Sequence, residues 1–265
     1  MKSLSFKTLL LIVLILSISG GDLLFSADEV VDTNIQFTFA IRYLGLKVAD
    51  VRLNDTRTQN EGRIDVIAKS VSLGNILFKI NNKYSVEYQR DYIPYSYSKS
   101  IEQKNFTQEK TTLWFPLEKR MEIKVDNTLA SHFHYEEEQF HDFFSALLYI
   151  RDHIVSKEPQ DIYIYANSNF WVAQISKLGE DKIGKRNTIK YSINFQQSSN
   201  NQKQRSDVLT NNIIKEDNTL YLWFTDDDER LPLQAEYDTS PFSVFWTLES
   251  YEISSPISYQ NRNFE

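Results

Sequence analysis

Apolar and polar residues alternate along most of the chain that follows residue 33. In the first such stretch, nearly every second side chain is apolar and the neighbours are mostly polar or small: Ile35, Phe37, Phe39, Ile41 and Tyr43. Successive side chains of a strand point to opposite faces, so a period of two predicts a strand with one buried face. Gly45 marks a turn, and the alternation resumes after it. Residues 34–57 are therefore predicted to form a β-hairpin.

The same alternation recurs along the rest of the chain. It is found at residues 63–71, 83–92, 95–103, 107–115, 119–125, 161–166, 171–178, 190–195, 220–225, 231–237 and 244–251. Turn-forming residues such as Asp91, Pro94 and Pro116 separate these stretches, and Gly179 and Gly184 bracket a further expected turn. The pattern predicts a long antiparallel meander.

One stretch, residues 142–155, has a helical period instead. Its apolar residues recur at spacings of three and four: Phe143, Phe144, Leu147, Leu148, Ile150 and Ile154. Asp142 is suited to cap the first turn, and Pro159 follows the last turn. The predicted fold is mainly β: a single strongly curved antiparallel sheet or incomplete barrel, with this amphipathic helix packed on its concave face.

The N-terminus has the pattern of a secretory signal peptide. Lys2 and Lys7 are followed by an apolar run from Leu9 to Ile18, and then by small residues. We expect cleavage after residue 21 or as late as 27, and a periplasmic location. The run is short for a bilayer span, so the alternative of an uncleaved anchor is disfavoured, and the mature chain is not expected to span a membrane. The chain has no cysteine, which excludes lipoprotein acylation and disulfides.

The remaining residues are predicted to form a single β-rich domain over 33–254. The polar, amide-rich stretch 196–217 is expected to be a mobile loop within it, and 255–265 a flexible tail. Without Lys2 and Lys7, the chain has 27 basic and 36 acidic residues, a charge of about −9. A negative surface argues against a nucleic-acid partner.

Three stretches resemble a known family. DFFSALLYIR (142–151), YLGLKVADVRL (43–53) and LYLWFTDDDERLPLQAEY (220–237) are similar to conserved patterns of the bacterial exported proteins grouped as domain-of-unknown-function family 3108. The chain departs from the family at Phe143, where proline is frequent, and in the length of the loop at 196–217. The resemblance implies a periplasmic β-rich fold with a curved sheet like that of the periplasmic lipoprotein carriers. It implies no established activity.

The four histidines define one candidate metal site. His132 and His134 would share a face of a strand, and His141, with Glu136 or Glu138, would have to converge on the same ion. A metal-dependent hydrolase that uses the cluster from His132 to His153 is therefore one hypothesis. No known zinc spacing is present, and solvated histidines on an acidic connector are the simpler interpretation, so we expect neither a metal nor a cofactor.

Two further groups of residues carry side chains suited to cation binding or catalysis. Asp226 to Arg230 clusters carboxylates, but it lacks the spacing of a calcium loop, so a β-turn held by aspartate side chains is favoured. Ser145 lies near His141 and His153, yet no oxyanion site accompanies it. Close helix packing explains Ser145 better than catalysis does.

Arg151 lies on or near the apolar face of the predicted helix. It should snorkel to solvent, pair with Asp228 or Glu236, or meet an anionic ligand group, because an isolated buried charge is costly. The leading functional hypothesis is a non-catalytic periplasmic protein that binds a lipid or acyl chain in the concavity of its sheet. The alternative is a structural module of the envelope that recruits a partner protein. The expected ligand site is Phe143, Leu147, Ile150, Arg151, Trp223 and Trp246.

Overall fold

The computed structural model describes residues 33–71, 74–75, 79–104, 106–198, 207, 209–239 and 241–254. The predicted signal peptide and C-terminal tail lie outside them. One long helix, α3 (Phe143–His153), and two 3-10 turns, η1 (Arg90–Tyr92) and η2 (Pro116–Glu118), accompany the strands. The strands are β1 (Thr33–Tyr43), β2 (Leu46–Arg57), β3 (Glu61–Ser70), β4 (Asn81–Gln89), β5 (Ile93–Gln103), β6 (Phe106–Phe115), β7 (Arg120–Val125), β8 (Thr128–His134), β9 (His141–Asp142), β10 (Gln160–Ala166), β11 (Asn169–Ile183), β12 (Arg186–Gln197), β13 (Thr219–Thr225), β14 (Pro232–Thr239) and β15 (Phe242–Ser254).

All of these strands belong to one sheet. Its order is β8-β7-β6-β5-β4-β3-β2-β1-β15-β14-β13-β12-β11-β10-β9. Neighbours are antiparallel except β9 and β10, which are parallel. The first and last strands pair along their length, from Asn34 with Ser254 to Tyr43 with Val244. β8 and β9 remain the edges, so the sheet is not closed into a barrel.

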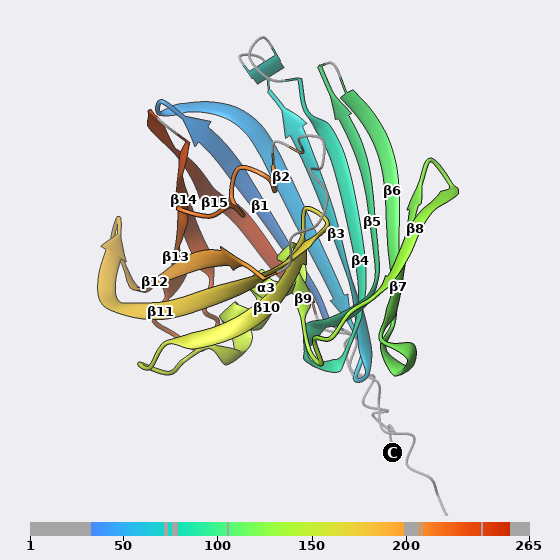
Figure 1. Cartoon of the computed structure of the whole chain (residues 1–265). Helices are drawn as coiled ribbons and strands as arrows, with labels where there is room; N and C mark the ends of the chain where they lie inside the picture. The colour runs from blue at the N-terminus through green and yellow to red at the C-terminus, as the bar shows by residue number, and fades with distance from the viewer. Residues whose placement is uncertain are drawn as a thin grey trace, which may run out of the picture. The chain divides into compact units, whose positions relative to one another are not determined.

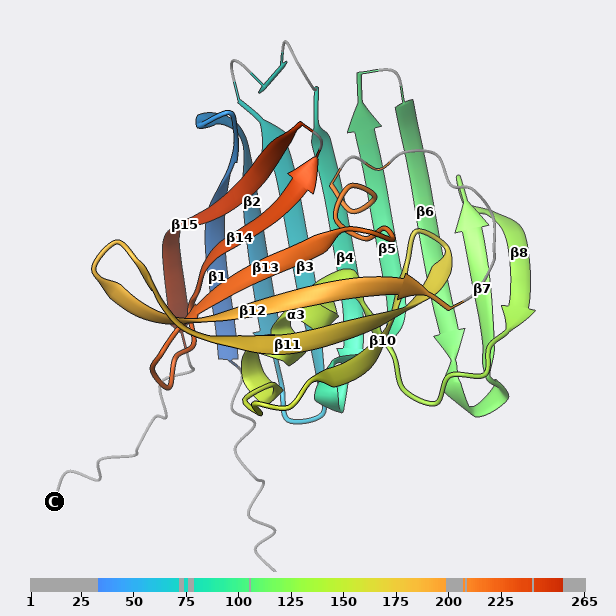
Figure 2. The same ribbon diagram turned by 60° about the vertical axis from the view of Figure 1, so that its left-hand side comes forward.

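The sheet folds over so that its two halves face each other across α3. Figure 1 shows β11 to β14 on one side and β3 to β8 on the other. Figure 2, turned by 60°, shows β10 to β13 crossing in front of β3 to β7, with the helix between them. The predicted curved sheet with one helix on its concave face is confirmed.

Side chains from both halves fill the space between them. The core includes Phe37 of β1, Tyr84 of β4, Phe144 of α3 and Tyr191 of β12, each at most 2% exposed. The ring centroids of Tyr84 and Phe144 are 5.0 Å apart. The apolar positions of the period-two and helical patterns are thus the positions whose side chains form this core.

A second, aromatic cluster lies where the two edges of the sheet approach each other. Rings from β6 and β10 meet directly, since the centroids of Trp114 and Tyr165 are 5.6 Å apart. Rings from the 135–140 connector and from β11 also meet, with 5.3 Å between Phe140 and Phe170. We call this the edge cluster: Trp114, Met121, Tyr135, Phe140, Tyr165 and Phe170. The edge cluster thus holds the two ends of the sheet together by side-chain packing, because no backbone hydrogen bonds pair β8 with β9.

The helix begins as predicted. The side chain of Asp142 accepts a hydrogen bond from the main-chain nitrogen of Phe144 at 2.8 Å, and Ser145 Oγ accepts one from the nitrogen of Asp142 at 3.0 Å. Asp142 Oδ2 also accepts a hydrogen bond from the main-chain nitrogen of Ser145 at 3.3 Å, and the reciprocal bonds between Asp142 and Ser145 form a capping box. It accounts for Ser145, which is fully buried.

Some turns and loops differ from expectation. The β11–β12 hairpin does not turn at Gly179. The pairing register shifts at Gly179, but β11 continues to Ile183, and the turn lies at Gly184. Residues 128–134 form a strand that the pattern did not indicate. The stretch 196–217 was expected to be a mobile loop, but Gln196 and Gln197 extend β12, and Leu209, Ile213 and Ile214 are buried in the core. Residues 199–206 and 208 lie outside the described part of the chain.

Candidate functional site

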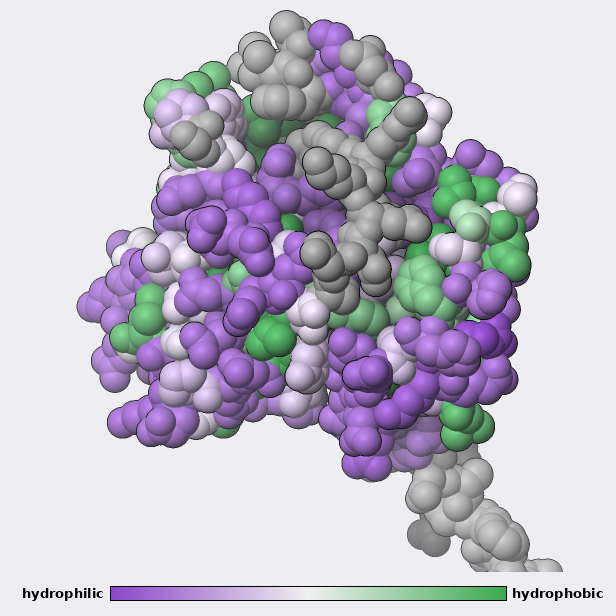
Figure 3. All heavy atoms as spheres, viewed as in Figure 1, coloured by the Kyte–Doolittle hydropathy of each residue, from purple (hydrophilic) through white to green (hydrophobic). Residues whose placement is uncertain are grey.

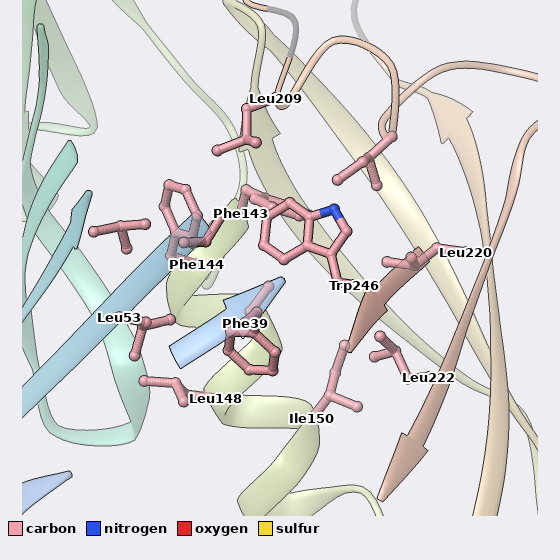
Figure 4. Close-up of a cluster of buried hydrophobic side chains, with 14 of the residues drawn as sticks. Phe39, Leu53, Phe143, Phe144, Leu148, Ile150, Leu209, Leu220, Leu222 and Trp246 are labelled. Carbon is pink, nitrogen blue, oxygen red and sulfur yellow. The ribbon is translucent and has the colours of Figure 1, made fainter. Parts of the chain in front are cut away.

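The predicted ligand site around α3 holds only a small cavity. Leu147, Arg151 and Trp246 line a space of about 60 Å³, together with apolar residues of β1, β2, β13 and β14. We call this space the helix cavity. Phe143 and Ile150 are buried in the same core but do not line it. Small-molecule pockets measure about 300 Å³ or more. The interior beside the helix is therefore filled by side chains (Figure 4).

Trp223 does not belong to this site. It was expected to face the interior, but the inward residues of β13 are Leu220, Leu222 and Phe224. The Trp223 indole nitrogen donates to Asp181 Oδ2 at 2.8 Å, and Lys190 Nζ lies 4.5 Å from its ring centroid. The prediction was wrong because Trp223 is buried on the outer face, under polar neighbours of β11 and β12.

Arg151 is buried at the far end of the helix, with 7% of its surface exposed. The prediction that Arg151 pairs with the side chain of Asp228 or Glu236 was wrong. Nη2 donates instead to the main-chain oxygen of Glu229 at 3.1 Å, and Nε lies 3.6 Å from Asp152 Oδ1. Arg151 is a packing and ion-pair residue in this geometry.

Asp152 joins Arg151 to a buried polar network between β2, η1 and α3. Arg57 Nη1 donates to Asp152 Oδ2 at 2.8 Å, and its Nε donates to the fully buried Asp55. The Tyr88 hydroxyl also donates to Asp55, at 2.6 Å. Burial raises the pKa of Asp55. Burial alone would also raise the pKa of Asp152, but the charges of Arg151 and Arg57 hold it below its usual range.

The structure does not assemble the histidines into a metal site. His132 and His134 share an exposed face of β8, as expected for a strand, whereas His141 is buried. His141 Nδ1 lies 2.9 Å from the main-chain oxygen of Tyr92, and burial lowers the pKa of His141 to about 4. Among the residues that the structure describes, no three His, Asp or Glu side chains are grouped to hold a metal ion. The hydrolase hypothesis gains no support from this arrangement.

His141 lines an acidic groove of about 650 Å³. The groove lies outside the interior, along the 136–139 connector and the start of β10, with Glu136, Glu137, Glu138 and Asp161 in its wall. The ring of Tyr149 packs against His141 in a tilted arrangement, with 4.4 Å between the ring centroids. A wall of carboxylates is unsuited to an apolar ligand.

The turn at 226–230 is held by aspartate side chains, as predicted. Asp227 Oδ1 accepts hydrogen bonds from the Thr225 hydroxyl at 2.6 Å and from the main-chain nitrogen of Arg230 at 3.0 Å. These contacts give Asp227 a structural role in the turn.

A larger apolar cavity lies at the end of the sheet that carries the β1–β2 and β14–β15 turns. It measures about 260 Å³, and we call it the open-end pocket. The register shifts between Ile41 and Arg42, which leaves Val48 without a partner on β1, and both Val48 and Ala49 are buried. Its lining residues are Ile41, Tyr43, Val48, Ala49, Ile80, Leu209, Asn212, Tyr237, Thr239 and Val244.

The open-end pocket and the helix cavity follow the same strands. Ile41 and Val244 line the pocket, and two residues further along, Phe39 and Trp246 line the cavity. The rings of Phe39 and Trp246 are 6.3 Å apart, and Figure 4 shows Leu209 on the opposite side of the Trp246 indole from Phe39. Trp246 lines the helix cavity but not the open-end pocket.

Two buried lysines form a polar cluster that the sequence analysis missed. Lys99 and Lys110 are directly opposed on β5 and β6, and both are at most 6% exposed. Lys99 Nζ lies 3.4 Å from Asp207 Oδ2, and Lys110 Nζ donates to Ser168 Oγ at 2.6 Å. Burial and the neighbouring charge of Lys99 lower the pKa of Lys110 to about 7. Each lysine occupies a position two residues from a buried residue of its strand, so the period-two pattern could have predicted that both lysines point inward.

The comparisons agree with this fold. The family model described as "Protein of unknown function (DUF3108)" matches residues 38–242. The chain belongs to the DUF3108 family. A crystal structure described as a beta-barrel-like protein of domain of unknown function DUF1849 from Brucella abortus is similar with a TM-score of 0.53 and 6% identity. The match covers 85% of this chain and 98% of that one. No curated protein sequence matches the chain.

Two of the stretches that carry the DUF3108 resemblance contact each other. Arg230, in the LYLWFTDDDERLPLQAEY stretch, donates from Nη2 to the oxygen of Ile154 at 2.9 Å and from Nε to the oxygen of Arg151. Arg151 lies in the last turn of α3, and Ile154 is the C-cap residue of the helix. No helix among the described residues is long and apolar enough to cross a membrane.

Proposed function

We propose that this chain is an exported, non-catalytic protein of the periplasm that binds an apolar or amphipathic chain, such as a lipid or acyl group, at the open end of its sheet. One observation carries the proposal: the open-end pocket has mainly apolar walls and a volume of about 260 Å³. This approaches the lower limit of small-molecule pockets, about 300 Å³. Export rests on the secretory pattern of the N-terminus.

The pocket is suited to a slender ligand. Ile41, Val48 and Val244 offer aliphatic contacts, and an acyl segment would gain from leaving water there. Asn212 and Thr239 are the polar members of the lining. They are placed to meet a polar end of an amphipathic molecule.

Native mass spectrometry and solvent extraction of the protein, purified from its own envelope fraction, test this function. We expect a co-purifying acyl species, and binding of a fluorescent fatty acid to the stripped protein. Val244→Trp should fill the pocket and lower the probe's affinity at least tenfold. Phe245→Trp is the matched control, because its side chain lies on the other face of β15. Equal binding by both variants, or no binding by the parent chain, would reject the proposal.

One observation favours a second function, a structural or interaction module of the envelope. The helix cavity is only about 60 Å³, so the interior beside α3 is filled. If the stripped protein binds no apolar probe but is recovered with a defined partner after crosslinking in the envelope, the module hypothesis takes precedence.

A further inference from the structure

Three large apolar side chains are exposed together at the open end of the sheet. Leu44 and Leu46 of the β1–β2 turn are 56% and 53% exposed, and Phe242 of the β14–β15 turn is 45% exposed. The turns are neighbours because β1 pairs with both β2 and β15. The hydrophobic patch at the upper left of Figure 3 lies over this end of β1 and β2. We call Leu44, Leu46 and Phe242 the rim.

The backbone at Leu44 is unusual for its residue type. Leu44 and Gly45 both have positive φ, 54° and 75°, in a two-residue hairpin turn. Such turns strongly favour Asn, Asp or Gly at the first position, because a leucine side chain is strained there. More than half of the Leu44 surface is exposed, so core packing does not explain the choice.

The rim borders the open-end pocket. The ring of Tyr43 lines the pocket and also meets the ring of Phe242, with 6.0 Å between centroids. We propose that the rim inserts into the surface of a lipid bilayer, so that an apolar chain passes between the bilayer and the open-end pocket without crossing water. The inference rests on the proposed function and adds the source of the ligand to it.

A bilayer fits the rim better than a protein partner does. Stable protein interfaces bury about 1,200 Å² or more over 20 to 30 residues a side. Three side chains at the tips of two turns offer far less, whereas a bilayer surface can envelop protruding apolar tips without complementary shape.

Charges beside the rim indicate what kind of bilayer. Lys47 Nζ lies 2.6 Å from Asp50 and 2.8 Å from Glu249, and Arg42 also pairs with Glu249. The basic groups next to the turn are thus neutralised within the protein. Docking should depend on apolar insertion, with little dependence on salt or on anionic lipid.

Co-flotation of the full mature chain with phosphatidylcholine vesicles tests the proposal. We expect binding that changes less than twofold between low and high salt. The double variant Leu44→Asn, Phe242→Ser should bind at least tenfold more weakly. Leu178→Asn, which removes an equally exposed leucine of β11, should bind like the parent chain. Asparagine suits the turn at position 44, so the double variant should keep its thermal midpoint.

Two controls separate the outcomes. Binding of a soluble fluorescent fatty acid, without vesicles, reports on the pocket alone and should survive the double variant. If the probe binds but the parent chain does not float with vesicles, the rim proposal is overturned and the proposed function stands. A dimer in analytical ultracentrifugation that dissociates in the double variant would overturn it in favour of a second copy of the chain.

Discussion

The guanidinium of Arg230 reaches the main-chain oxygen of Ile154, 2.9 Å from Nη2, and so satisfies a carbonyl at the end of the only long helix that the structure describes. Helix C-termini leave carbonyls without partners and carry a partial negative charge. The turn after β13 therefore supplies the cation that ends α3. The same guanidinium is 3.3 Å from the Tyr191 hydroxyl.

Replacing Arg230 should destabilise the fold. Arg230→Lys keeps the charge but cannot reach several carbonyls at once, so we expect a loss of about 2 kcal/mol in the free energy of unfolding. Urea denaturation measures it. Arg63→Lys, at an exposed arginine of β3, should change stability by less than about 0.5 kcal/mol. Equal effects of the two substitutions would mean that the helix end does not depend on Arg230.

The helix should contribute to stability mainly through its most buried ring. Phe144 is 1% exposed, so Phe144→Ala should cost about 3–5 kcal/mol. Leu147 is half-buried beside a cavity that already exists, and Leu147→Ala should cost about 1–2 kcal/mol. Denaturant midpoints of the two variants provide the measurement. A larger loss for Leu147→Ala would contradict the packing described.

His141 should make the protein sensitive to acid. Its pKa is about 4 in the folded chain and about 6.5 when exposed, so its contribution to stability is complete above pH 6.5 and is lost as the pH falls towards 4. The loss amounts to about 3 kcal/mol. His141→Asn keeps a donor for Tyr92 and should abolish it, as seen in thermal midpoints between pH 7.5 and 4.5.

Asp142 acts in the opposite direction. Burial raises its pKa to about 6 from an ordinary 3.8, so the folded chain takes up a proton first and gains stability as the pH falls from 6 to 3.8. The two neighbours partly cancel in the parent chain. The effects of His141 and Asp142 on stability are separated by comparing His141→Asn with the parent chain. If stability falls with pH in the same way in both proteins, His141 is not the source of the acid sensitivity.

Lys110 should destabilise the protein at neutral pH. Its folded pKa of about 7 lies below the ordinary 10.5, so its contribution to stability is present above pH 10.5 and is lost as the pH falls through 7. Lys110→Met should therefore stabilise the chain on the order of 2 kcal/mol at pH 7, and less at pH 10. Lys124→Met, on the outer face of β7, is the matched control for the loss of a lysine charge.

The edge cluster should hold the two edges of the sheet together. Trp114→Ala removes a 3% exposed ring that meets both Phe140 and Tyr165, and we expect a cost of about 3–5 kcal/mol. Amide hydrogen exchange should accelerate first in β7, β8 and β10. Trp223→Ala, at an outer-face tryptophan, is the control. If exchange in β7, β8 and β10 accelerates in Trp223→Ala and not in Trp114→Ala, the edge cluster does not hold the two edges together.

Local patterns predicted most of the elements and the curved sheet, because period-two alternation and the Asp142 cap act within a few residues. They failed where contacts from distant segments decide. Leu209 and Ile213 look like part of a polar loop but pack into the core. Trp223 is a different case, because the alternation of Leu220, Leu222 and Phe224 along β13 already places its side chain on the outer face. The open-end pocket escaped prediction because β1, β2, β14 and the 209–212 turn build it together.

The pairing of β1 with β15 has a consequence for how the chain folds. Asn34 and Ser254 are hydrogen-bonded neighbours although 220 positions separate them along the chain. Closing so long a loop carries a large entropic cost, and folding slows as contacts become more distant in sequence. The strands β2 to β8 can pair in order as a meander, but β1 keeps one edge open until β15 arrives. The final ladder should therefore form late, and the slow kinetic phase should follow substitutions in β15 more closely than those in β5 or β6.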